Sequence, residues 1–275
     1  AGGYPAFLLS AYRPARVLKG GVRTGASGSR FRDALAVFQF AVSISLIIGT
    51  AIIMNQLRFM KTRDPGFRKE GVVIVRVMPD RLRRSYPSIK ARLGQVPGVL
   101  GVAATSTVPG IGPDIGQFVP EGSGQDQAQT MDVMNVNADF LSTMGITLVE
   151  GRNFTADDGA DASTAVLINR TAARKFGWDA AVGRTLRAYS NAARRLEART
   201  VVGVVEDFQL ASDYRPIAPL CIGASPADLG GLVIRVDPRT AGETLAAMKA
   251  IWKDIDPDRP FDYFLLEDQF AGQYR

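Results

Sequence analysis

The sequence contains no histidine and only one cysteine, and these two shortages exclude many kinds of active site. Without histidine there is no Ser-His-Asp triad, no Cys-His pair and no imidazole ligand for a metal. One cysteine forms neither an internal disulfide nor a zinc cage. We therefore expect that the protein is not an enzyme and has no catalytic residue, cofactor or metal site. Cys221, between Leu220 and Ile222, is expected to be a small buried residue.

Motifs that bind phosphate are also missing. No Gly-x-x-x-x-Gly-Lys-Ser/Thr run occurs, so the chain itself is not an ATPase of the P-loop type. The glycines of 110–116 resemble a dinucleotide loop only superficially, because the third comes one position late and Pro113 interrupts the run. Asp157, Asp158 and Asp161 lack the spacing of a calcium-binding loop, so we assign them to a solvated acidic turn. Glu206 and Asp207 are adjacent in sequence, and adjacent residues on a strand point to opposite faces, so they are not expected to act as a pair.

Acidic residues are absent before Asp33, although the whole chain carries 33 Lys and Arg against 27 Asp and Glu, a net charge of +6. Excess positive charge suits either nucleic acid or an anionic membrane. Here the basic residues stand directly before the most apolar segment, so we assign them to a membrane surface and expect no nucleic-acid partner. They are Arg13, Arg16, Lys19, Arg23, Arg30 and Arg32.

Segment 34–57 contains no charged residue, and its run 35–54 has transmembrane length. A helix needs about 20 apolar residues to cross the hydrocarbon core, whereas the apolar part of a signal peptide has about 7–15. The alternative is a buried helix in a soluble core, but a long soluble helix seldom lacks a charged face. The sequence therefore predicts a transmembrane helix over 34–57.

Small and polar side chains form a stripe along this segment. Ala36, Gln39, Ser43 and Thr50 fall within about 60° of one another on a helix of 3.6 residues per turn. Helices that pack together in lipid favour such residues at their contacts, so we expect this stripe to dock against transmembrane segments outside this chain. In the alternative, the hydroxyl groups bond back to carbonyls of their own helix.

Basic residues flank the helix on both sides, so charge alone does not predict its orientation in the membrane. The lengths of the two flanking segments are used instead. A long domain after a membrane helix is translocated regardless of its charge, whereas a short basic arm stays inside. We interpret 1–33 as the end of a preceding membrane helix followed by a basic cytoplasmic loop, in which 20–29 has the composition of a flexible linker. A processed N-terminus lying on the membrane is the alternative. Residues 58–275 are expected to form a periplasmic core domain.

Hydrophobic periodicity predicts an α+β domain after the membrane helix. Two βαβ-like units, 71–109 and 231–268, are expected to pair into one sheet of split βαβ type, with 110–230 as an inserted mixed α/β subdomain. Strands are expected at 71–77, 99–108, 131–136, 164–168, 200–205, 232–236 and 261–266, and helices at 85–96, 137–145, 172–176 and 241–255.

Polar residues at helix starts predict how these helices are capped. Asn137 and Asn169 are expected to be N-caps, and this explains Asn169 better than its glycosylation sequon, a pattern that Asn153 shares. Thr240 and Glu243 have the spacing of a capping box.

Many segments occur in the order and spacing of one known family, although no single motif is decisive. On these segments the whole chain resembles the second half of an FtsX-like ABC transporter permease that carries a MacB-like periplasmic core domain. The segments are 4–6, 10–20, 38–40, 43–49, 140–145, 150–158, 166–169, 176–177, 182–184, 202–208, 256–260, 268–270 and 274–275.

The resemblance implies a membrane permease component that relays motion from a separate ATPase to its periplasmic domain, for export or envelope remodelling. It also implies a bacterial inner-membrane location. Partners would be the ATPase subunit, other transmembrane helices, membrane lipid, and a periplasmic protein or a second copy. The alternative is a singly anchored periplasmic sensor or adaptor that binds a peptide or envelope protein, with the segment 112–129 as a loose, polar recognition loop.

Overall fold

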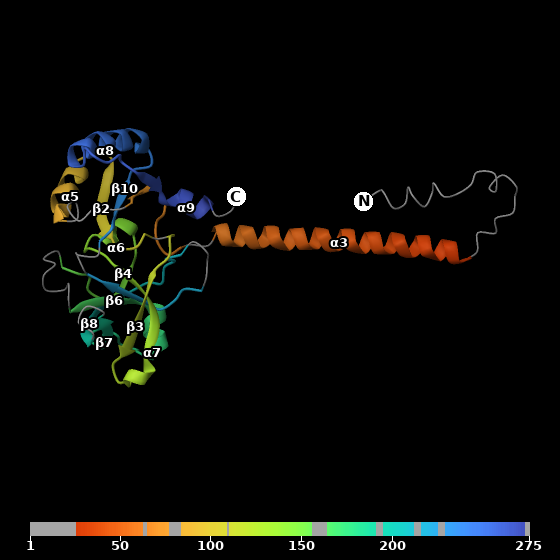
Figure 1. The fold of residues 1–275 in the computed structure, drawn as a ribbon, viewed down its shortest axis with the longest axis horizontal. Coiled ribbons are helices and arrows are strands. Elements are labelled where there is room, and N and C mark those ends of the chain that lie inside the picture. Colours follow the sequence, from red (N-terminus) through yellow and green to blue (C-terminus); the bar gives the residue numbers. More distant parts are fainter. Residues whose placement is uncertain are drawn as a thin grey trace. The chain divides into compact units, whose positions relative to one another are not determined.

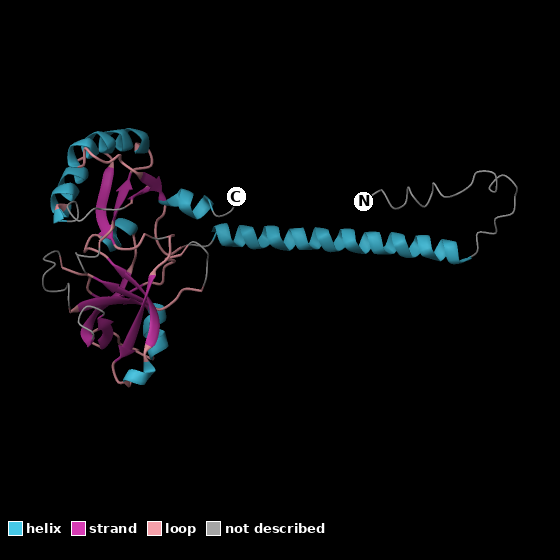
Figure 2. Ribbon diagram, viewed as in Figure 1, coloured by secondary structure: helices cyan, strands magenta, loops and turns pink. Residues whose placement is uncertain are grey.

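The computed structural model describes residues 26–62, 65–76, 84–108, 110–155, 164–190, 195–211, 216–224 and 229–272 (Figure 1). The chain divides into two compact units, Ala1–Thr62 and Arg63–Arg275. The described part of the first unit is one helix, and the second unit is a mixed α/β domain with two sheets (Figure 2). Residues 1–25 and the acidic turn at Asp157, Asp158 and Asp161 lie outside the described residues.

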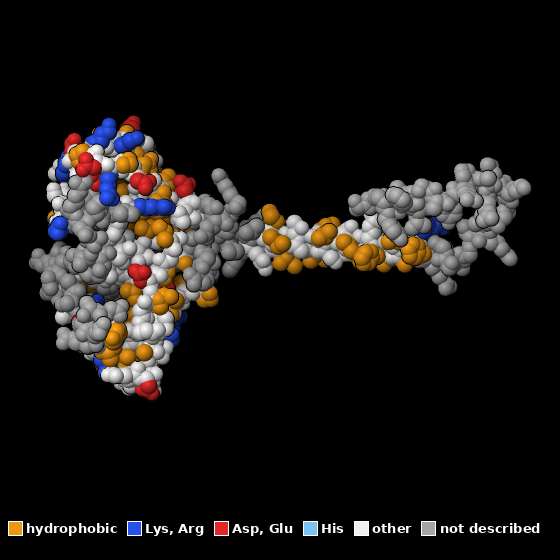
Figure 3. Space-filling view, in the orientation of Figure 1, with side chains coloured by type: hydrophobic (Ala, Val, Ile, Leu, Met, Phe, Trp, Pro, Cys, Tyr) orange, Lys and Arg blue, Asp and Glu red, His pale blue; other side chains and the backbone are white. Residues whose placement is uncertain are grey.

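Helix α3 (Ala26–Thr62) contains the expected membrane segment. Its stretch Phe31–Gln56 has 26 residues and a mean hydropathy of 2.2, which makes it long and apolar enough to cross a membrane. Apolar side chains are exposed along it (Figure 3). The helix begins at Ala26, so the prediction of a flexible linker was wrong for 26–29. Extending an existing helix costs far less than nucleating one, which allows its Gly and Ser residues to join.

The smaller sheet has four strands in the order β11-β1-β10-β2, and all neighbouring strands are antiparallel. β1 and β2 are parallel to each other, lie on either side of β10 and are connected by a helix. β10 and β11 are likewise parallel, lie on either side of β1 and are connected by a helix. The elements are β1 (Val72–Val75), α5 (Tyr86–Gly94), β2 (Val99–Thr105), β10 (Gly231–Val236), α8 (Ala241–Ile255) and β11 (Tyr263–Leu265).

Both faces of this sheet are buried. Val73 and Val75 of β1 face the core that contains Leu93 of α5 and Trp252 of α8. Successive side chains on a strand point to opposite faces, so Ile74 joins a different core. That second core contains α6 (Phe140–Met144) and parts of the larger sheet. Burial on both sides explains why β1 is a continuous apolar run.

The larger sheet has the order β5-β8-β6-β9-β4-β3-β7, and β7 also pairs with β8, so six of the strands form a closed ring. β8 closes the ring because it is 11 residues long and pairs with β7 along its first half and with β6 along its second. The strands are β3 (Asp114–Pro120), β4 (Gln129–Asn135), β5 (Leu148–Gly151), β6 (Ala165–Asn169), β7 (Thr185–Ser190), β8 (Arg195–Val205) and β9 (Leu220–Gly223).

A third core lies within this part of the domain and takes side chains from all six strands of the ring. It also includes Ala172 and Ala173 of α7 (Arg170–Phe176), which follows β6 directly. The strand residues are Phe118, Met131, Val166, Ile168, Leu186, Val201, Val204 and Cys221. A 3₁₀ helix, η1 (Gln125–Gln127), and a last helix, α9 (Leu266–Gly272), complete the described elements.

The expected helices and strands all occur, with shifted ends, and the coarse prediction of an apolar helix followed by a sheet-rich α/β domain is confirmed. Sequence periodicity missed β3, β5, β7 and β9. The prediction that 112–129 is a loose loop was wrong, because it contains β3 and η1. The first residues of β3 are exposed and only the last three are buried, so the strand shows no regular apolar alternation.

Two glycines face each other where β5 pairs with β8. Gly151 is opposite Gly203 in the register, and Gly151 has a φ of 75°. A Cβ atom at Gly203 would lie 2.5 Å from the carbonyl oxygen of Arg152 and 3.0 Å from that of Glu150. The two strands therefore approach more closely than any residue with a side chain allows.

We expect Gly203→Ala to destabilise the chain by about 1–3 kcal/mol, because the added methyl group overlaps backbone oxygens that have no room to move. Thermal or urea unfolding of the detergent-solubilised chain measures the change. Gly242→Ala is the matched control: its Cβ meets nothing within 4 Å on α8, so stability should be unchanged or rise by up to about 1 kcal/mol. Equal stability of the two variants would refute the close-approach explanation.

Candidate functional site

Three phenylalanine rings meet where the first and last described segments of the domain lie together. Phe67 makes edge contacts with Phe208, at 6.4 Å between ring centroids, and with Phe270, at 5.7 Å. All three side chains are buried. Phe67 belongs to the segment that follows the membrane helix, Phe208 follows β8, and Phe270 is on α9. The contact therefore joins three parts of the domain that are far apart in sequence.

Backbone hydrogen bonds reinforce the same contact. The amide of Gln209 donates to the carbonyl of Pro65 at 2.7 Å. Gly66 has a φ of 81°, and a Cβ there would overlap the carbonyl oxygen of Asp207 and the Cα of Phe208. The segment 65–67 is thus pressed directly against the segment 207–209.

The glycine run at 110–116 contributes packing at this place. Gly110 has a φ of 95°, and its amide donates to the carbonyl of Leu210 at 2.7 Å. A Cβ at Gly110 would lie 3.0 Å from the Cγ of Gln269 and 3.2 Å from the Cε2 of Phe270. We call the residues 65–67, 110–111, 207–211 and 269–270 the junction.

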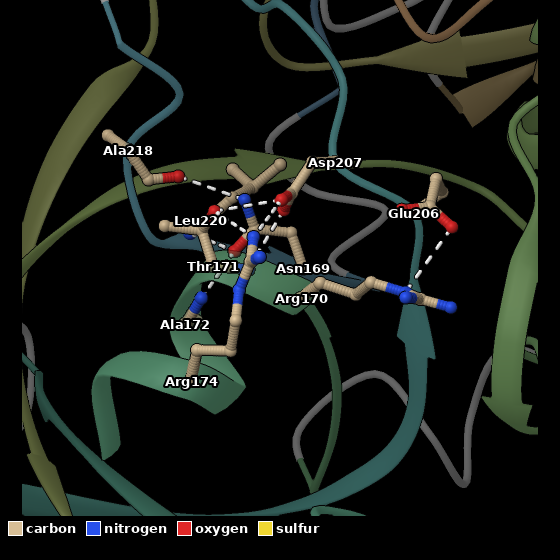
Figure 4. A network of polar contacts seen from close by, with 9 residues as sticks. All are labelled: Asn169, Arg170, Thr171, Ala172, Arg174, Glu206, Asp207, Ala218 and Leu220. Atoms are coloured by element: carbon tan, nitrogen blue, oxygen red, sulfur yellow. Dashed lines mark hydrogen bonds and ion pairs between the residues drawn. The ribbon is translucent and has the colours of Figure 1, made fainter. Parts of the chain in front are cut away.

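Asp207 fixes the junction to the neighbouring helix α7 (Figure 4). Its Oδ1 accepts from the backbone amide of Thr171 at 2.8 Å, and its Oδ2 accepts from the Thr171 hydroxyl at 2.9 Å. The guanidinium of Arg174 donates to the same Oδ2 at 2.6 Å. The Asp207 side chain is 16% exposed and that of Arg174 is 71% exposed, so the bonds to Thr171 are better shielded from water than the bond to Arg174. Glu206 pairs instead with Arg170, at 3.3 Å, so the two carboxylates do not form a shared site.

Asn169 is the N-cap of α7, as its sequence position predicts. Its side-chain oxygen accepts from the amides of Ala172 and Leu220, each at 2.9 Å, and its amide group donates to the carbonyl of Ala218 at 2.9 Å (Figure 4). This single buried side chain joins β6, α7 and the start of β9. The start of α7, which Asp207 connects to the junction, is therefore held by buried polar groups that are hydrogen-bonded.

Two other capping predictions were wrong. Asp139, not Asn137, occupies the N-cap position of α6. The side-chain oxygen of Asn137 accepts instead from the backbone amide of Ala104 at 3.0 Å. This bond satisfies a buried amide on the outer edge of β2, where no described strand supplies an acceptor. Thr240 precedes α8 as expected but makes no capping bond, and its hydroxyl lies 3.3 Å from that of Thr244.

Metal-ligating side chains do not cluster in the described part of the domain. Among the described residues, no group of three or more His, Cys, Asp or Glu side chains is placed to hold a metal ion. Cys221 is buried as predicted, and burial raises the pKa of its thiol to about 12. Its sulfur is therefore an inert part of the core.

The stripe on α3 has a mixed outcome. The hydroxyl of Thr50 donates to the carbonyl of Leu46 at 2.8 Å, which is the back-bonding alternative. Within the described residues, the side chains of Gln39 and Ser43 form no hydrogen bond. They are free to bond to another helix, so docking through Ala36, Gln39, Ser43 and Thr50 stays a prediction.

An apolar helix of membrane-spanning length followed by a two-sheet α/β domain defines the class: an α/β domain that follows a candidate membrane helix. The model of one family, the MacB-like periplasmic core domain, matches residues 34–251. The chain belongs to this family, which confirms the resemblance to FtsX-like ABC transporter permeases and makes the domain extracytoplasmic. No curated protein matches the chain.

One solved structure supports the fold, and two others match with lower scores, all at low sequence identity. The periplasmic region of MacB from Actinobacillus actinomycetemcomitans matches with a TM-score of 0.53 and 14% identity, over 78% of this chain and 98% of that one. The extracellular domain of the noncanonic ABC-type transporter YknZ from Gram-positive bacteria has a TM-score of 0.48 and 13% identity, over 70% and 97% of the two chains. A domain of a putative permease from Porphyromonas gingivalis has a TM-score of 0.44 and 19% identity, over 72% and 92%.

We expect Phe208→Ala to cost about 3–5 kcal/mol of stability, because it removes one of the three buried rings of the junction and leaves a cavity. Tyr189→Ala is the control, since this aromatic side chain on β7 is 52% exposed and its removal should change stability by about 0.5 kcal/mol or less. Urea unfolding in detergent compares the two. Similar small losses for both variants would show that the cluster is not a structural centre.

Proposed function

We propose that the chain is part of the membrane permease component of an ABC transporter in the bacterial inner membrane. It relays motion from a separate ATPase to the periplasmic domain, for export or envelope remodelling. Membership of the MacB-like family supports this proposal, and the junction is the observation that carries it.

The junction is suited to a relay because of where it stands in the chain. Residues 65–67 follow the helix that ends at Thr62 after two residues of sequence, so the chain links them covalently to the end of the helix. Phe67 and the carbonyl of Pro65 bind the segment 208–209, which follows β8 of the larger sheet and is tied to α7 through the bonds of Asp207. Close-packed interiors transmit such displacements with little loss.

The same arrangement involves the far end of the domain. Phe270 packs on Phe67, and β11 pairs with β1, so the first and last segments of the domain move as one body. We infer that motion is received by the sheet subdomain, 71–109 with 231–268, and is passed to the inserted subdomain, 110–230. In this proposal the residues before α3 belong to a preceding membrane helix and its cytoplasmic loop, which is shorter than the predicted 1–33 because α3 begins at Ala26.

A cysteine accessibility experiment tests the orientation. Gln125→Cys places a thiol on an exposed turn, in a Cys221→Ala background that removes the native thiol. In intact spheroplasts a membrane-impermeant maleimide should label Gln125→Cys fully. The matched variant Ser10→Cys, in the proposed cytoplasmic part, should be labelled only after lysis. Labelling of Gln125→Cys only after lysis would overturn the proposal.

A second experiment separates a packed permease helix from a simple anchor. Gln39→Leu combined with Ser43→Leu keeps α3 apolar but removes two polar side chains that form no hydrogen bond among the described residues. We expect recovery of the assembled permease on affinity purification to fall at least tenfold, because interhelical bonds and close packing are lost. Ile48→Leu with Ile52→Leu, on the opposite side of the helix, is the control. Unchanged assembly would favour the singly anchored sensor or adaptor.

A further inference from the structure

The closed ring of the larger sheet has two unlike ends. At one end, α7 follows the last residue of β6, and its residues Ala172 and Ala173 pack into the apolar core of the ring. The other end lies at the start of β6, where Ala165 pairs with Thr200 of β8. Polar or small residues take interior-facing positions at this second end, and we call three of them the mouth of the ring: Asn135, Arg199 and Gly223.

The strand register shows that the three residues of the mouth face the interior. Arg199 is paired with Leu186, whose buried side chain belongs to the core of the ring, and paired side chains lie on the same face. Gly223 comes two residues after Cys221 of the same core, and Asn135 is paired with Gly223. β8, β9 and β4 therefore meet at the mouth.

The guanidinium of Arg199 reaches past β6 to β9. A Cβ atom at Gly223 would lie 3.4 Å from the Nη1 of Arg199 and would overlap the side-chain oxygen of Asn135. Burial raises the pKa of the Cys221 thiol, and the charge of Arg199 acts on it in the opposite direction. One cation and one amide group thus converge where the glycine has no side chain.

Arg199 lacks the partner that a buried guanidinium normally has. Its Nε is buried and forms no hydrogen bond, and no hydrogen bond or ion pair joins its guanidinium to any described residue. Glu197 faces the same way two residues earlier on β8 but does not pair with it. Removing a charged donor from water without a partner is costly, so the guanidinium favours an anionic partner.

The chemistry of the mouth indicates which anion this is. A guanidinium presents parallel N–H groups that match two oxygens of one carboxylate or phosphate group. Arg199 as a whole is only partly buried, so a ligand from solvent can reach it. The side chains of Val201 and Cys221 behind it are buried and apolar, and a low local dielectric strengthens a charge-assisted hydrogen bond. The mouths of β-barrels are common places for ligand sites.

We propose that the mouth of the ring binds an oxyanion, a carboxylate or a phosphate group, through the guanidinium of Arg199. The site goes beyond the relay, because it gives the inserted subdomain a ligand of its own.

Titration calorimetry of the full chain in a non-ionic detergent tests the site with inorganic phosphate and with acetate. One of the two anions should bind at one site per chain, in the millimolar range or tighter. Binding of phosphate alone assigns the site to phosphate groups, and binding of acetate alone assigns it to carboxylates. Arg199→Gln should weaken this binding at least tenfold, because the charge and the paired donors are lost.

Arg187→Gln is the matched control. Arg187 lies on the neighbouring strand β7 and is paired with Ala198, so its side chain is on the opposite face from Arg199. Its guanidinium donates to the carbonyl of Ser123 at 2.8 Å. The same charge is removed in both variants, but Arg187→Gln should leave anion binding unchanged.

A second variant protects the test against a folding defect in Arg199→Gln. Asn135→Asp places a fixed carboxylate near the guanidinium, so it should compete with the anion and weaken binding at least tenfold. Thermal unfolding checks that each variant is folded. The proposal is overturned if neither anion binds, if Arg199→Gln or Asn135→Asp binds as well as the unmodified chain, or if Arg187→Gln weakens binding as much as Arg199→Gln does.

Discussion

The contact of Phe67 with Phe208 and Phe270 is the interaction on which the architecture of the domain depends. It fixes the segment after the membrane helix to the larger sheet and to the last helix at one point. Each ring is buried, and burial of an aromatic side chain contributes about 1.5–3 kcal/mol. The glycines at 66 and 110 allow the backbones to come close enough for the contact to form.

The two sheets shield their strands from solvent in different ways around that point. The smaller sheet is buried on both faces, between α5 and α8 on one side and the core shared with α6 on the other. The larger sheet closes on itself, so most of its strands have no free edge.

Sequence reasoning succeeded where burial produces a simple pattern. β1 and β10 are apolar along their length because both faces are covered, and α8 has one apolar face. It failed for β3 and β7, which mix exposed and buried residues, and for Asn137, whose partner lies on a strand 33 residues away. The junction left a local signal only in its glycines, and such a signal does not reveal what the glycines approach.

By itself the sequence determined the membrane helix, the capping of α7 by Asn169 and the absence of histidine chemistry, because each depends on residue type and short-range spacing. Only the tertiary structure decided which strands pair, how the ring closes and which rings meet at the junction. Those features come from contacts between residues far apart in the chain, which form when complementary surfaces pack together and which no local propensity encodes.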